Sequence, residues 1–133
     1  MTLPTAPTTA TLTPSSNFTD TLSISWSGAA AGVNNPIAGY FVVFQTSTNG
    51  TSWAPSTEGN YNLPMSTTYG TAECDTSAWA PGTYCRVLIR PYAENAVNGT
   101  NQGNLYTSPT IRKKQVTDPT PPAISINKTQ GSI

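Results

Sequence analysis

The feature that most constrains this chain is a series of short segments in which apolar and polar residues alternate, each ended by Pro, Gly or Asn. In residues 21–27, Leu, Ile and Trp fall on one face and Ser on the other. This period of two predicts a strand with one buried face. Residues 37–45 and 84–89 are longer apolar runs rich in β-branched and aromatic side chains. No stretch has a useful helical period, so the sequence predicts an all-β fold.

Turn-forming residues separate the predicted strands. Asn49-Gly50 lies between polar residues and predicts a hairpin turn, with Trp53 on a short return strand. Residues 54–66 contain Pro and Gly at intervals and are interpreted as a loop. Further strands are expected at residues 67–76 and 105–114, with a hairpin loop at 95–104. Short strands at regular spacing with turn signals between them favour a β-sandwich.

The composition limits what such a domain can do. The chain has 133 residues, 6 Lys plus Arg, 6 Asp plus Glu and no His. This length fits one domain, and the missing basic excess argues against nucleic-acid binding. No apolar run approaches the roughly 18 residues that a membrane span needs, so no membrane insertion is expected. Without His there is no Ser–His or Cys–His catalytic pair, so we expect neither enzyme activity nor a cofactor.

The two cysteines, Cys74 and Cys85, are separated by ten residues. This spacing fits no zinc-binding motif. Taken alone, the pair is compatible either with two buried thiols or with a disulfide.

Four motifs occur in order along one domain length. They are LSISW at 22–26, IAGYFVVF at 37–44, STNGTSW at 47–53 and WAPGTYCRV at 79–87. Together they resemble a fibronectin type III module. The resemblance implies an all-β, seven-stranded antiparallel β-sandwich with Greek-key connections. The implied organisation is an extended N-terminal arm and first strand at 1–17, the sandwich at 18–115, and a Pro-rich linker and C-terminal arm at 116–133.

The resemblance also places Cys74 and Cys85 on the fifth and sixth strands, which lie in opposite sheets. We therefore expect a disulfide across the core, although members of this family usually have none. An inward Cys85 sends Arg86 and Arg90 to solvent, which avoids the burial of an unpaired charge. The predicted core consists of Leu22, Ile24, Trp26, Tyr40, Val42, Phe44, Val87 and Ile89.

The outward side of the third and sixth strands is the candidate partner-binding surface. There Phe41 and Val43 point away from the core, and Leu88 joins them between two arginines. Three apolar side chains on a face that ordinarily contacts water predict either a docking surface or coverage by the chain's own tail. The aromatic residues Trp53, Trp79, Tyr61 and Tyr69 are a candidate platform for sugar rings, so a glycan is an alternative ligand.

The C-terminal arm is the second candidate for partner binding. Proline lacks an N–H, so residues 118–122, Asp-Pro-Thr-Pro-Pro, predict a stiff extended spacer. Ile124 and Ile126 then fall on one face and are expected to add to an exposed sheet edge of a partner. The run Arg112-Lys113-Lys114 is expected to protect an edge strand.

These features favour a non-enzymatic structural protein on the surface of a virus particle, such as a phage capsid decoration or accessory protein. We expect it to attach to other virion proteins in many copies, through its arms or its apolar sheet face. The low charge, the missing catalytic set and the lack of a signal peptide after Met1 motivate this expectation. The alternative is a secreted or cell-surface module for adhesion or glycan binding.

Overall fold

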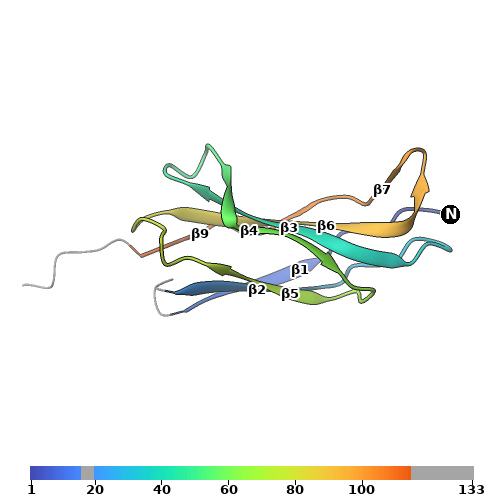
Figure 1. Cartoon of the computed structure of the whole chain (residues 1–133), viewed down its shortest axis with the longest axis horizontal. Helices are drawn as coiled ribbons and strands as arrows, with labels where there is room; N and C mark the ends of the chain where they lie inside the picture. Colours follow the sequence, from blue (N-terminus) through green and yellow to red (C-terminus); the bar gives the residue numbers. More distant parts are fainter. Residues whose placement is uncertain (16–19, 115–133) are drawn as a thin grey trace, which may run out of the picture.

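The computed structural model describes residues 1–15 and 20–114. All regular structure in this part is β, arranged in two antiparallel sheets that lie face to face (Figure 1). One sheet has three strands in the order β1-β2-β5. The other has six, in the order β4-β3-β6-β7 with β8 and β9 also paired to β6. The strands are β1 (Thr9–Pro14), β2 (Thr21–Ser27), β3 (Ile37–Ser47), β4 (Ala54–Pro64), β5 (Gly70–Asp75), β6 (Tyr84–Val97), β7 (Thr100–Gln102), β8 (Tyr106–Thr107) and β9 (Ile111–Arg112).

The core lies between the two sheets. All eight residues expected there are at most 3% exposed, because the alternation in β2, β3 and β6 turns every second side chain inward. The Trp26 and Tyr40 rings meet edge to face with centroids 5.1 Å apart. Tyr40 donates its hydroxyl hydrogen to the carbonyl oxygen of Thr67 at 2.6 Å. Because burial removes water from this hydroxyl, the pKa of Tyr40 is raised.

Two segments interpreted as loops are strands. β4 occupies most of 54–66, and its prolines lie near its two ends, which an edge strand tolerates. An irregularity in the β3–β4 pairing brings Gly59 against Phe44, where a Cβ atom would approach the Phe44 Cβ to 2.6 Å. β6 continues to Val97, and Asn98-Gly99, both with positive φ, make a tight turn into β7.

The long last strand expected at residues 105–114 is interrupted. Only β8 and β9 within it pair with β6, and Ser108-Pro109 lies between them. At Ser108 the backbone N–H donates to the carbonyl of Val87 at 2.9 Å, and the hydroxyl accepts from the Val87 N–H at 2.8 Å. Because the following Pro109 has no N–H to give to the ladder, the regular pairing stops there.

The expected disulfide is wrong. Cys74 on β5 and Cys85 on β6 do lie in opposite sheets, but no disulfide joins them, and both are fully buried. A disulfide needs Cα atoms within about 7 Å and Cβ atoms that point toward each other, which placement in opposite sheets does not ensure. The Cys85 thiol points to the carbonyl of Arg86 at 3.7 Å. Burial, with a smaller effect of Cys74, raises the pKa of Cys85 to about 12.

The N-terminal residues are tied to the body of the sandwich. Pro4 and Pro7 are buried, and the Thr5 N–H donates to the carbonyl of Ala30 at 2.9 Å. Asn35, 1% exposed, donates from Nδ2 to the carbonyls of Thr2 and Asn95, and its Oδ1 accepts from the Asn95 N–H. One buried amide therefore joins three distant segments of the chain.

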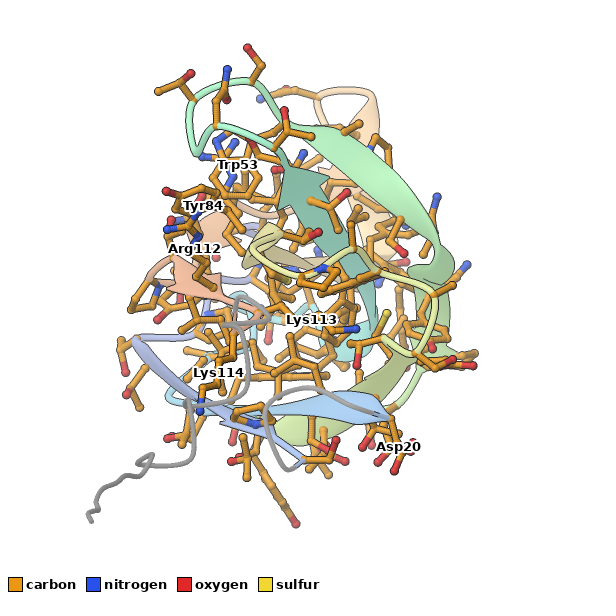
Figure 2. All side chains as sticks on the ribbon, turned by 90° about the vertical axis from the view of Figure 1, so that its left-hand side faces the viewer. Asp20, Trp53, Tyr84, Arg112, Lys113 and Lys114 are labelled. Atoms are coloured by element: carbon orange, nitrogen blue, oxygen red, sulfur yellow. The ribbon has the colours of Figure 1, made fainter. Side chains whose placement is uncertain are left out.

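The three basic residues near the end of the described chain differ from one another. Lys113 is only 9% exposed, and its Nζ donates to the carbonyls of Thr76 and Trp79, both at 2.8 Å. Figure 2 shows Lys113 turned into the molecule and Lys114 outside it. Lys113 therefore joins the chain after β9 to the connection that follows β5, a role beyond the edge protection expected from the basic run.

Candidate functional site

The candidate site is the outer face of the six-stranded sheet, which we call the docking face. It consists of the outward side chains of β3 and β6 and the residues that pack on them. The pairing register sets Val43 opposite Leu88 and Phe41 opposite Arg90. The structure thus brings together the three sheet residues predicted to bind a partner, Phe41, Val43 and Leu88, and each is half-buried.

Arg86 forms one flank of the Val43–Leu88 pair. Its guanidinium carbon lies 4.4 Å from the centre of the Trp53 ring, and its Nε donates to Oε1 of Gln45 at 2.7 Å. The turn at Asn49-Gly50 returns the chain so that Trp53 reaches this position, just before β4. The stacking and the hydrogen bond together hold the plane of the guanidinium.

Arg112 repeats this arrangement at the end of the face. Its guanidinium carbon lies 4.5 Å from the centre of the Tyr84 ring, and its Nε donates to the carbonyl of Gly82 at 3.0 Å. Tyr84 and Arg112 are cross-strand partners on β6 and β9. Figure 2 shows Trp53, Tyr84 and Arg112 one below another along one side of the sandwich.

The opposite flank of the apolar pair is formed by Arg90. Its Nη1 donates to the carbonyl of Gly103 at 2.9 Å, so this side chain leans away from β3. Phe41 packs against Tyr92 with ring centroids 4.8 Å apart, and the Tyr92 hydroxyl donates to Oδ1 of Asn62 at 2.7 Å. Aromatic side chains fixed in this way extend the apolar centre along β6.

Arg86, Arg90 and Arg112 are the cationic side chains of the docking face, and the carboxylate of Glu94 lies exposed further along β6. Among the described residues, no carboxylate forms an ion pair with Arg86, Arg90 or Arg112. The carboxylates of Asp20, Glu73 and Asp75 belong to the three-stranded sheet and its ends. Hydrogen bonds from the Ser77 side chain and backbone lower the pKa of Asp75, and Lys113 adds a smaller effect.

The outer face of the three-stranded sheet has a different character. Its outward rows pair Thr11, Ser25 and Thr71 across the three strands, and next to them Thr13, Ser23 and Glu73. Short hydroxyl side chains dominate, and the Ser23 hydroxyl donates to Glu73 at 3.3 Å. This face therefore presents mainly hydroxyl groups to solvent, around an open hollow of about 680 Å³.

The aromatic residues considered for sugar binding do not form one platform. Arg86 lies over the Trp53 ring, while Trp79 packs against the core. Tyr61 lies edge to face with Phe44 and donates its hydroxyl hydrogen to the carbonyl of Glu73. Only Tyr69, 56% exposed, presents much of its ring to solvent.

The surface hollows of the described residues lie along β5. One of about 490 Å³ is lined by Asp20, Thr21, Tyr61, Glu73, Asp75 and Ser77. A smaller one of about 130 Å³ is lined by Tyr61, Leu63, Thr71, Ala72 and Glu73. Within residues 1–15 and 20–114, no three His, Cys, Asp or Glu residues are grouped to hold a metal. The same residues contain no helix that could span a membrane.

Sequence reasoning placed Arg86 and Arg90 on the outer surface but did not assign them a role. Their contacts depend on partners from other parts of the chain, namely Gln45 on β3, Trp53 before β4 and Gly103 after β7. The sequence did contain one signal for their position. If Cys85 points inward, the alternation along β6 turns both Arg86 and Arg90 to the outer face. Ile124 and Ile126, also predicted to bind a partner, lie outside the described residues.

Comparison with known proteins adds no relative. The sequence matches no protein-family model, and no curated protein is significantly similar to it. The chain is an all-β protein with two antiparallel sheets.

Proposed function

We propose that this protein is a non-enzymatic structural module on the surface of a virus particle, and that it attaches to other particle proteins through its docking face. The observation that carries the proposal is the makeup of that face. Arg86, stacked on Trp53, and Arg90 flank the half-buried pair Val43 and Leu88, and Arg112 stacks on Tyr84 at the end of the face. Aromatic residues and arginine are enriched among the interface residues that contribute most of the binding energy.

The difference between the two outer faces supports a particle-bound role. The three-stranded sheet presents Ser and Thr, whose hydroxyls are well hydrated and offer little apolar area to other proteins. The six-stranded sheet presents the aromatic and cationic side chains. A module bound through the second face would expose the first to solvent, as a decoration protein on a shell requires.

The finer fold assignment is part of this proposal. We infer a fibronectin type III-like arrangement, because β1-β2-β5 and β4-β3-β6 follow the sheet order expected for such a module. The strands β7, β8 and β9 all pair with β6 and together correspond to one interrupted last strand. Counted in this way, the sandwich has the seven strands implied by the sequence motifs.

The C-terminal arm is proposed as a second attachment. The stiff segment at residues 118–122 would carry Ile124 and Ile126 away from the sandwich toward a sheet edge of a neighbouring protein. A two-point attachment raises the effective concentration of each contact for the other.

Mass spectrometry of virus particles purified from the source tests the proposal. The chain should co-purify at a fixed ratio to the major shell protein through a density gradient. Its presence only in particle-free fractions would contradict the particle location. A glycan array provides the comparison with the adhesion alternative: strong hits that disappear in Trp53→Ala would favour a sugar-binding module.

A further inference from the structure

We propose that the docking face binds an extended acidic segment of a partner protein, in which two carboxylates flank an apolar side chain. This inference deepens the proposed function and rests on it, since it names the chemistry of the partner at the same face. The arrangement that carries it is the sequence Arg86, Leu88, Arg90 on one side of β6, with Val43 beside Leu88.

The spacing of the two arginines sets the spacing of the carboxylates. Arg86 and Arg90 are four residues apart on one strand, or about 13 Å along it. Arg86 leans toward Trp53 on the β4 side, while Arg90 leans toward Gly103 on the β7 side. A bound segment would therefore cross the strands diagonally, above Val43 and Leu88.

The guanidinium of Arg86 is positioned before any partner arrives. Its plane stacks on the Trp53 ring, and its Nε donates a hydrogen bond to Gln45. In the described part of the chain, its terminal nitrogens have no hydrogen-bond partner. A carboxylate can accept two parallel hydrogen bonds from these nitrogens in a bidentate pair. Little side-chain entropy remains to be lost on binding, which favours affinity.

The apolar pair distinguishes a protein segment from a polyanion. A nucleic acid or an acidic polysaccharide would place hydrophilic groups on Val43 and Leu88 and gain nothing from them. An apolar side chain at that point removes both residues from water, which contributes about 25 cal/mol per Å² of buried apolar area. The order Arg86, Leu88, Arg90 on this face therefore matches a peptide in which an apolar side chain lies between two carboxylates.

The test uses the full chain and a labelled peptide with the central sequence Glu-Thr-Leu-Thr-Glu, measured by fluorescence anisotropy. We expect saturable binding, weakened about tenfold by Arg86→Gln and about tenfold by Arg90→Gln, because each removes one charged pair. Arg86→Lys should restore only part of the affinity, since a lysine cannot make the bidentate pair. Leu88→Thr should weaken binding without altering its dependence on salt.

Lys114→Gln is the matched control, because it removes an exposed positive charge that lies away from Arg112, toward the three-stranded sheet (Figure 2). It should leave binding unchanged, and every variant should keep the thermal midpoint of the wild type within a few degrees. A peptide with both Glu replaced by Gln, and one with Leu replaced by Ser, should each bind more weakly.

Several outcomes would overturn the inference. Equal binding of heparin and the peptide would show a non-specific cation patch, and no binding to the peptide, by the full chain or by a chain lacking residues 115–133, would remove the proposed partner. Concentration-dependent dimerisation abolished by Arg86→Gln would assign the face to a second copy. If the protein still co-purifies with particles in any of these cases, the proposed function stands and only the partner chemistry is wrong.

Discussion

The ammonium of Lys113 donates to the carbonyl of Thr76 at 2.8 Å, which joins β9 of the six-stranded sheet to the chain just after β5 of the three-stranded sheet. A second bond goes to the carbonyl of Trp79. Both Lys113 and Thr76 are buried, so water cannot replace these bonds. A residue in a basic run thus connects the two sheets at one end of the sandwich.

We therefore expect Lys113→Met to lower the free energy of unfolding by about 1–2 kcal/mol, because it removes both hydrogen bonds of the ammonium, although the Thr76 carbonyl still accepts from the Trp79 N–H. The measurement is guanidinium chloride unfolding followed by tryptophan fluorescence. Lys114→Met, a neighbouring exposed residue, should change stability by less than about 0.5 kcal/mol. Equal effects of the two substitutions would contradict the role assigned to Lys113.

The sequence predicted the features that depend on neighbouring residues and missed those that depend on contacts between distant parts of the chain. Alternation in residues 21–27 and 37–45 identified the strands and the apolar core residues on them except Ile37, because burial follows a period of two. The strand at residues 54–64 was missed because its prolines and glycine resemble a loop, and their tolerance depends on an edge position that only the pairing reveals.

The candidate site shows the same limit. The outward parity of Phe41, Val43 and Leu88 follows from the strands themselves, and the structure brings these residues together. The stacking of Arg86 on Trp53 joins residues from two different hairpins and has no local signal. The disulfide was expected from strand placement alone, and placement in opposite sheets does not by itself satisfy the geometry that a disulfide needs.

The free thiols lead to a prediction on chemical labelling. Native protein in the absence of reductant should react slowly with iodoacetamide, because both cysteines are 0% exposed and the pKa of Cys85 is raised to about 12. Unfolding in guanidinium chloride without reductant should give two added groups by intact mass. An unfolded product with no added group would show a disulfide and contradict the structure.

The same pKa predicts how stability depends on pH. Cys85 has a folded-state pKa of about 12 against an ordinary value of 9.0, so the folded state holds its proton more tightly. The contribution of this thiol is complete below pH 9 and is lost as pH rises toward 12, with a slope of at most about 1.4 kcal/mol per pH unit. Unfolding curves of wild type and Cys85→Ala across this range should show a shallower pH dependence for the variant. Parallel curves would rule out a role for the thiol.

The buried amide of Asn35 gives a prediction for the N-terminal segment. Asn35→Ala removes its bonds to Thr2 and Asn95 and should cost about 1–3 kcal/mol of stability, since it removes three part-buried hydrogen bonds of one amide. Hydrogen exchange should show faster exchange at Thr5, whose N–H bonds to Ala30. The neighbouring exposed residue Asn34 has a positive φ, so Asn34→Gly is the suitable control and should be close to neutral.

Gly70 is required by the ring of Trp26, its cross-strand partner on β2. A Cβ atom at position 70 would lie 2.5 Å from the ring and 2.9 Å from the Met65 sulfur. The ring is only 3% exposed and packs edge to face on Tyr40, so it has little room to move. We expect Gly70→Ala to cost about 1–3 kcal/mol through overpacking.

A double-mutant cycle with Trp26→Phe separates this clash from a backbone effect. The smaller ring removes the contact, so Gly70→Ala should cost clearly less in the Trp26→Phe background than in the wild type. Gly99→Ala provides the contrasting case, because the space around it is open but its φ is +87°. There the cost of about 1 kcal/mol comes from the backbone and should be the same in both backgrounds. Additive effects of Gly70→Ala and Trp26→Phe would show that the ring is not what requires a glycine at position 70.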